Sequence, residues 1–160
     1  MDIRIGELRN EKVVTLLKIH HEDMLSHSPP ESVHALDLSA LESPNVTFWS
    51  FWVNEELAGI GALKELDKEH GEIKSMRTST NQLRKGIARK LLEHIIRQAN
   101  IRSYKKLSLE TGTMNAFLPA QKLYLQFGFQ ECEPFGGYKE DPYSMFMTKD
   151  IVSLSDSLVV

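Results

Sequence analysis

A strand, a polar loop and a glycine-led helix follow one another between residues 72 and 103, and this order constrains the fold more than any other stretch. Glu72 to Arg77 is a short strand-like run, and Ser79 to Lys85 is a polar loop. A helix is predicted from Gly86, because apolar side chains recur on one broad face of it. The apolar positions are Ile87, Ala88, Leu91, Leu92, Ile95, Ile96 and Ala99. A face of this width must pack against the rest of the domain.

The entrance of this helix carries four cationic side chains around a single glycine. Arg84 and Lys85 precede Gly86, and Arg89 and Lys90 follow it. Positive charge is unfavourable there by itself, because the helix dipole already places partial positive charge at an N-terminus. Unpaired amides together with basic side chains instead suit a bound phosphate or pyrophosphate. The pattern therefore predicts an anion-binding loop.

Two common phosphate-binding motifs are excluded by the glycines. A Walker loop needs G-x-x-x-x-G-K-[ST] and a dinucleotide fold needs G-x-G-x-x-G, but Gly86 is the only glycine between Gly71 and Gly112. The run from Leu83 to Ala88 instead resembles motif A of the GNAT acetyltransferases, Q/R-x-x-G-x-G/A, with Leu83 in place of the usual Gln or Arg. In that family the backbone amides of this loop hold the pyrophosphate of acetyl-CoA. The resemblance implies cofactor contacts from Arg84, Lys85, Gly86, Ile87, Ala88 and Arg89.

A second segment, residues 109–129, resembles the other conserved GNAT block. That block is a strand, an asparagine and a helix ending L-Y-x-x-x-G-F, and this sequence has Leu123-Tyr124 and Gly128-Phe129 at the ending. Asn115 is the implied pantetheine contact, although two extra residues separate it from Tyr124. The segments SPPESVHAL and SLETG also look like an uncharacterised bacterial GNAT subgroup.

The resemblance implies an α+β fold with a mixed, mostly antiparallel central sheet of six to seven strands. Helices would cover both faces, and strands four and five would splay apart. Local patterns predict strands at Asp2–Leu8, Val46–Val53, Leu57–Leu66, Glu72–Arg77, Lys106–Glu110 and Tyr143–Thr148, and further helices at Glu11–Leu25, Glu31–Leu41 and Pro119–Phe127. We expect one GNAT domain over residues 1–150 and a C-terminal tail over 151–160.

Acetyl transfer to an amine requires a base for the ammonium, donors for the oxyanion and an acid for the departing thiolate. Glu72 lies fourteen residues before Gly86, where histone acetyltransferases of the family place a catalytic glutamate. Glu110, on the neighbouring strand, is the second candidate base, and an ordered water is the third. The resemblance assigns protonation of the CoA sulfur to Tyr124. The backbone expected to hold the thioester oxygen lies in Met76, Arg77 and Thr78.

Composition narrows the partners. A net charge of -3 gives no general reason to expect binding to nucleic acid or an anionic membrane, and no apolar run is long enough to span one. The single cysteine, Cys132, excludes an internal disulfide framework and is compatible with the reducing cytoplasm. His20, His21, His27 and His34 lack metal-ligand spacing, so no metal is expected.

The leading hypothesis is an acetyl-CoA-dependent N-acetyltransferase acting on a primary amine of a small molecule or peptide. One alternative is a CoA-binding regulatory module that has lost turnover, and another is a nucleotide-binding protein. The acceptor would be shaped by Pro29 to His34, Glu110 to Thr113 and Phe135 to Tyr143. Its identity stays open, as does the question of a homodimer.

Overall fold

Among the residues that the structure describes, seven strands form one sheet, in the order β1-β2-β3-β4-β5-β7-β6. The computed structural model describes residues 1–33 and 37–151 of the chain. The strands are β1 (Asp2–Ile5), β2 (Val46–Val53), β3 (Glu56–Asp67), β4 (His70–Thr78), β5 (Lys106–Gly112), β6 (Gln130–Cys132) and β7 (Ser144–Asp150). Neighbouring strands are antiparallel except β4 and β5, which are parallel. The predicted mixed, mostly antiparallel sheet is confirmed.

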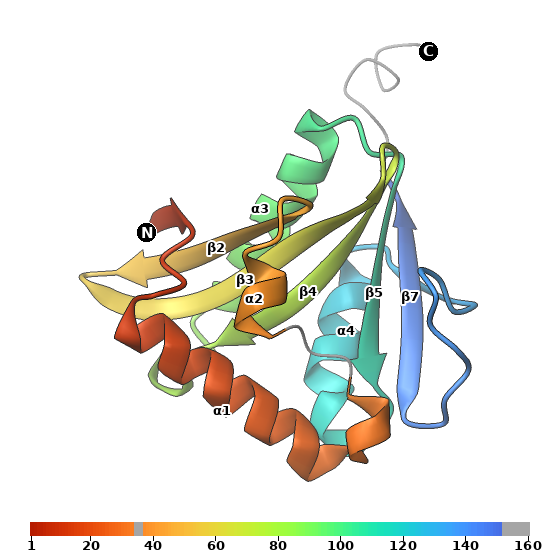
Figure 1. The fold of residues 1–160 in the computed structure, drawn as a ribbon, viewed down its shortest axis with the longest axis horizontal. Coiled ribbons are helices and arrows are strands. Elements are labelled where there is room, and N and C mark those ends of the chain that lie inside the picture. The colour runs from red at the N-terminus through yellow and green to blue at the C-terminus, as the bar shows by residue number, and fades with distance from the viewer. Residues whose placement is uncertain (34–36, 152–160) are drawn as a thin grey trace.

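Helices cover both faces of this sheet (Figure 1). α3 (Ile87–Ile101) and α4 (Leu118–Gln126) pack on one face, and α1 (Glu11–His27) and the short α2 (Leu38–Leu41) on the other. Three 3-10 turns lie in the connections: η1 (Pro30–Ser32), η2 (Thr80–Gln82) and η3 (Asn115–Phe117). In Figure 1, α1 runs past the ends of β3 and β4, both of which it contacts, toward the lower end of β5.

The larger hydrophobic core lies between the sheet and α3. Ile87, Leu91, Leu92, Ile95 and Ala99 are buried along one face of that helix, as the sequence periodicity predicts. Two glycines of β3 let the helix approach closely. A Cβ on Gly59 would lie 2.9 Å from Leu91 Cδ1 and one on Gly61 3.1 Å from Ile95 Cδ1. The helix that begins at the anion-binding loop is therefore fixed firmly against the sheet.

The segment between α1 and β2 differs from its prediction. The expected helix over Glu31–Leu41 is wrong, because η1 and the four-residue α2 occupy separate parts of that range. Pro29 and Pro30 start the first turn, and Asp37 caps the second by accepting a hydrogen bond from Ala40 N (2.7 Å). Each turn has its own start signal, so the segment is not one helix. His34 lies outside the described residues.

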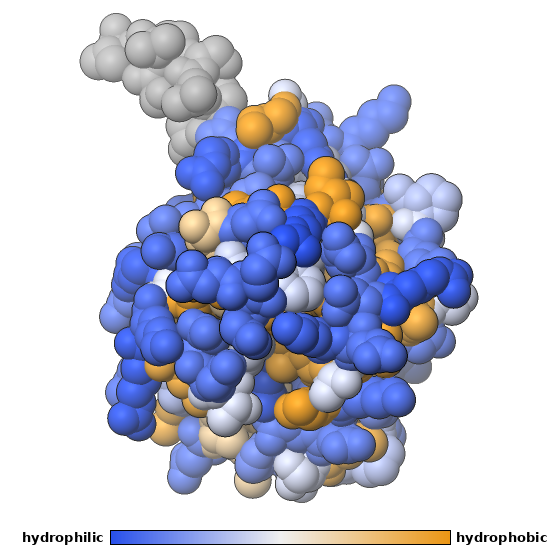
Figure 2. All heavy atoms as spheres, turned by 90° about the vertical axis from the view of Figure 1, so that its left-hand side faces the viewer, coloured by the Kyte–Doolittle hydropathy of each residue, from blue (hydrophilic) through white to orange (hydrophobic). Residues whose placement is uncertain are grey.

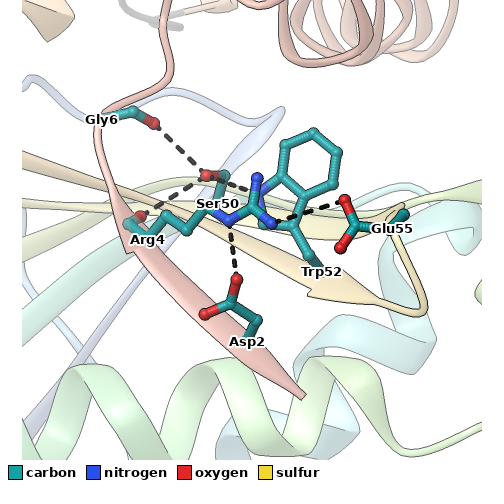
Figure 3. A network of polar contacts seen from close by, with 6 residues as sticks. All are labelled: Asp2, Arg4, Gly6, Ser50, Trp52 and Glu55. Atoms are coloured by element: carbon teal, nitrogen blue, oxygen red, sulfur yellow. Dashed lines mark hydrogen bonds and ion pairs between the residues drawn. The ribbon is translucent and has the colours of Figure 1, made fainter.

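Side-chain contacts hold β1 at the edge of the sheet in addition to its backbone pairing with β2 (Figure 3). Buried Ser50 accepts a hydrogen bond from Trp52 Nε1 (2.9 Å) and donates toward the carbonyl oxygens of Arg4 and Gly6. The Arg4 guanidinium lies 4.6 Å from the centre of the Trp52 ring. Figure 2 shows that the surface on this side is mostly hydrophilic, with hydrophobic atoms in small separate areas. None of the described helices is long and apolar enough to cross a membrane.

Candidate active site

β4 and β5 pair over only part of their length. The parallel ladder joins His70–Ile73 to Lys106–Leu109, and the two strands diverge beyond it (Figure 1). A cavity of about 250 Å³ lies in the diverging part. Side chains from α1, η1, β4, β5 and α4 line it, so it reaches from one face of the sheet to the other. The splay between strands four and five is thus confirmed, and it forms a ligand-sized space.

A β-bulge interrupts β4 beside this cavity. Ala62 of β3 pairs with Lys74 and Ile60 with Arg77, so two residues of β4 face one residue of β3. Ser75 adopts a left-handed backbone conformation there (φ 55°). A bulge leaves backbone groups out of the ladder, and Ser75 and Met76 both line the cavity.

The bulge also changes the face of the sheet on which the Arg77 side chain lies. Strict alternation predicts that Arg77 points to the opposite face from Lys74, whereas the extra residue puts both side chains on the α1 face. The Arg77 guanidinium donates from Nη1 to Asp23 Oδ2 of α1 (2.5 Å). That hydrogen bond lowers the pKa of the Asp23 carboxyl. The Arg77 side chain, one of the predicted cofactor contacts, therefore binds Asp23 on the α1 face of the sheet, opposite the face that carries α3.

The predicted anion-binding loop leads into a helix N-terminus that no side chain caps. Gly86 is the N-cap of α3 with φ 78°, no side chain caps the helix, and its first turn has no acidic residue. Arg84 is also left-handed (φ 63°). By contrast, the Asn10 side chain caps α1 by accepting from Lys12 N (2.9 Å). The first amides of α3 have no intrahelical acceptor, so the loop offers donors to an anion.

The other residues predicted to bind the cofactor differ in exposure and in the elements that carry them. Lys85 is exposed, Ala88 is half-buried and Ile87 is buried in the core. Arg89 donates to Gln126 Oε1 (2.7 Å) and lies over the Phe127 ring, so its side chain joins α3 to α4. Asn115 opens η3 and is exposed, and Thr78 ends β4 opposite Gly59.

Tyr124 lies in the wall of the cavity, 8% exposed. α4 carries it, and its ring contacts Phe129 edge to face. Gly128 (φ 91°) ends the helix and lets the chain turn, so that Phe129 N donates back to the Tyr124 carbonyl oxygen (3.1 Å). Burial raises the pKa of the Tyr124 phenol to about 12.

The two candidate glutamates have different surroundings. Glu72 is 2% exposed, and its Oε2 accepts hydrogen bonds from Tyr138 Oη (2.7 Å) and Lys74 Nζ (3.1 Å). Glu110 is half-buried and follows directly after Leu109, the last residue of β5 that pairs with β4. Both glutamates line the cavity.

Sequence reasoning missed three of the polar residues that surround the site. Lys74 could have been found from the sequence, because it lies two positions after Glu72 and so on the same face of the predicted strand. Asp23 and Tyr138 could not, since their partners are 54 and 66 residues away in the chain.

The wall provided by α1 is polar. His20, Asp23 and His27 occupy one face of that helix and line the cavity. Burial, and then the Arg77 charge, lower the pKa of His20 to about 4. No cluster of three or more potential metal ligands occurs among the described residues.

Comparison with known proteins identifies the family. Residues 13–129 match the family model described as the acetyltransferase (GNAT) family. The chain is 58% identical over 151 residues to the uncharacterized N-acetyltransferase YsnE of Bacillus subtilis, covering 94% of this chain and all of the relative. It is 51% identical to the uncharacterized N-acetyltransferase YedL of Escherichia coli, covering 91% and 92%. The protein belongs to the GNAT family of N-acetyltransferases.

A solved structure agrees with this assignment at the level of the fold. A GNAT family acetyltransferase from Elizabethkingia anophelis, with acetyl-CoA bound, superposes with a TM-score of 0.66 at 22% identity, covering 93% of this chain and 97% of that one. Together with family membership, the fold supports acyl transfer as the general activity.

Proposed function

We propose that the protein transfers the acetyl group of acetyl-CoA to a primary amine of a small molecule or peptide. One observation carries the proposal: a single cavity of about 250 Å³ joins Tyr124 and the β4 bulge to the polar wall of α1. The thioester and the amine can therefore meet in one cavity, and attack can be direct in a ternary complex. The small volume favours an acceptor that inserts only a short amine-bearing part.

The α3 entrance would bind the pyrophosphate. The amides after Gly86 are uncapped, and Arg84 and Lys85 add positive charge beside them. The pantetheine would run along the diverging strands past Met76, Arg77 and Thr78, with Asn115 at the rim. The acetyl-CoA present in the Elizabethkingia anophelis structure supports this assignment for the shared fold.

We assign the general base to Glu110. An alkyl amine has a pKa near roughly 10, so a group in the site must take its proton before attack. Glu72 already accepts two hydrogen bonds at Oε2 from Lys74 and Tyr138, which favours a structural role. Glu110 lies where β4 and β5 separate, with its side chain in the cavity wall.

After proton removal, the amine nitrogen bonds to the carbonyl carbon and the carbon–sulfur bond breaks. A backbone amide of the bulge at Ser75 and Met76 would donate to the oxyanion. Tyr124 Oη would donate its proton to the departing sulfur. Burial raises the pKa of Tyr124 to about 12, which makes the phenol a weaker acid. Burial also disfavours a free thiolate and so raises the pKa of the departing thiol, which offsets part of that effect.

The test is release of CoA thiol from acetyl-CoA across a panel of small amines and short peptides. Amine-dependent release that rises with enzyme concentration, together with an acetylated amine by mass spectrometry, is expected. Tight acetyl-CoA binding with no release for any amine would instead identify a CoA-binding regulatory module. Thermal stabilisation by ATP but not by acetyl-CoA would contradict both.

A further inference from the structure

A closed network of three polar side chains lies under the loop between β6 and β7. Lys74 Nζ donates to Tyr138 Oη (2.6 Å) and to Glu72 Oε2 (3.1 Å), and Tyr138 Oη donates to the same carboxylate oxygen (2.7 Å). The side chains of Lys74 and Glu72 are 7% and 3% exposed. An ammonium has three protons to place, so the phenol oxygen supplies an acceptor that the carboxylate alone does not.

The loop that carries Tyr138 is shaped to deliver its hydroxyl to β4. Gly136 (φ 57°) and Gly137 (φ 86°) turn the chain immediately before it. The Tyr138 ring then packs against Phe135 and Phe146, at centroid distances of 5.3 and 5.5 Å. Burial and the charges of two glutamates raise the pKa of this phenol, so it remains a hydrogen-bond donor at neutral pH.

The position of Lys74 makes this network important for the reaction. Ile73 and Leu109 are the last residues that β4 and β5 pair with each other, so Lys74 and Glu110 follow them directly on the two diverging strands. Paired residues of neighbouring strands share a face, and both of these side chains line the cavity. Lysine carries its charge on a flexible four-carbon chain. An unrestrained Lys74 ammonium could therefore extend into the space that the acceptor amine must enter.

We propose that Tyr138 is a positioning residue that holds the Lys74 ammonium against Glu72 and away from Glu110. The cavity beside Glu110 then stays open to the ammonium form of the acceptor, which would be repelled by a lysine in the same place. Glu72 acts in this arrangement as a fixed counter-charge. The inference rests on the proposed function, because Glu110 is the base only if an amine is acetylated.

The first experiment follows Lys74 directly and needs no acceptor. The protein is treated with N-hydroxysuccinimidyl acetate, and acetylation of Lys74 is timed by peptide mass spectrometry, with the 74% exposed Lys105 side chain as internal reference. Tyr138→Phe keeps the ring and its packing but removes the hydroxyl, so labelling of Lys74 should accelerate several-fold. Tyr143→Phe, a change at a cavity tyrosine whose hydroxyl is not a partner of Lys74, is the matched control. Unchanged labelling of Lys74 in Tyr138→Phe overturns the proposal.

The second experiment measures kinetics with the best amine from the panel. In Tyr138→Phe the acceptor KM should rise by about tenfold or more, because juxtaposed like charges are strongly unfavourable, while the KM for acetyl-CoA stays the same. The same change is then made in Glu72→Gln/Lys74→Met, which has no ammonium to misplace and should be insensitive to it. An equal effect in both backgrounds would mean that Tyr138 acts through packing, against the proposal.

The two experiments can contradict the proposed function and the role of Tyr138 independently of each other. If no amine supports CoA release, the proposed function is wrong, but the labelling still decides whether Tyr138 restrains Lys74. If the double-variant background has no measurable turnover, labelling of Lys74 and the KM change in Tyr138→Phe decide together. Faster labelling with an unchanged acceptor KM would reject the role in acceptor binding.

Discussion

β4 and β5 are paired with each other at one end and splayed apart at the other. In the paired end, His70 Nε2 contacts Ser108 Oγ (2.6 Å), and Ser108 Oγ contacts Thr148 Oγ1 (3.0 Å). A Cβ on Gly71 would lie 2.7 Å from the Tyr104 ring. Polar groups there find partners across the sheet, and packing is tight. The paired end therefore holds the structure together.

In the splayed end, the ladder stops, β4 bulges at Ser75, and the cavity opens beside Glu110 and Tyr124. Ser75 and Met76 of the bulge line the cavity there, and the Arg77 side chain contacts Asp23 of α1. One break in a parallel ladder thus divides the two strands into a tightly packed part and a part that lines a cavity. Substitutions in each part should then affect different measurements.

The largest effect is expected from Tyr124→Phe in the splayed end. The ring and its contact with Phe129 remain, but the acid for the leaving sulfur is lost, so kcat should fall by about 100-fold to 10,000-fold. Acetyl-CoA affinity by calorimetry should be unchanged. Tyr104→Phe in the paired end is the matched control, because the Tyr104 hydroxyl donates to Glu65 (2.8 Å) and is remote from the cavity lining. Wild-type kcat in Tyr124→Phe would show that water protonates the sulfur.

The next effect concerns the anion-binding loop. Gly86→Asp should weaken acetyl-CoA binding by roughly 100-fold, because like charges about 5 Å apart near a protein surface repel by about 3 kcal/mol. A Cβ at Gly86 would meet nothing within 4 Å, so the cost to the protein is the strain of a side chain at φ 78°, which Asp and Asn adopt more readily than most residues. Gly86→Asn, which also accepts a positive φ, separates charge from size. Equal affinities for the Asp and Asn variants would argue against a phosphate at this helix start.

Part of the splayed end could be predicted because its signals are local. The spacing of apolar residues after Gly86 predicts the helix that the structure has, and the charged entrance predicts an anion site there. The Glu72–Lys74–Tyr138 network could not be predicted, because Tyr138 meets Glu72 only after β5 and β7 have paired. The bulge at Ser75 was equally hidden: no residue in the sequence requires it, and it reverses the face of Arg77. Local periodicity determines elements, whereas contacts between distant residues determine where their polar groups point.

A smaller effect, on stability alone, is expected from Gly71→Ala in the paired end. The new methyl would overlap Tyr104 and lie 2.9 Å from Leu63 Cδ1, and overpacking of this kind costs about 1–3 kcal/mol. Urea denaturation should report this loss, while acetyl-CoA affinity is retained. Gly112→Ala at the other end would push on Phe117, which lines the cavity, and should alter turnover as well. A Gly71→Ala variant that loses acetyl-CoA affinity would mean that the two ends are coupled.

The smallest effect is a pH dependence that separates His20, beside the splayed end, from His70 in the paired end. Burial lowers the pKa of His20 to about 4, and its buried Nδ1 has no hydrogen-bond partner among the described residues. Below pH 6.5 the unfolded chain takes up a proton at this residue that the folded chain does not, so stability falls as pH falls and the loss is complete near pH 4. Between pH 7.5 and 5 this group should remove about 2 kcal/mol from the free energy of unfolding. Urea denaturation of His20→Gln at both pH values should lack that loss.

The pKa of His70 is also lowered by burial, but the charges of Asp67 and Glu72 oppose the shift, so His70→Gln should change the pH dependence less. An identical pH dependence in wild type and His20→Gln would show that the α1 wall opens to water and leaves the histidine free to ionise.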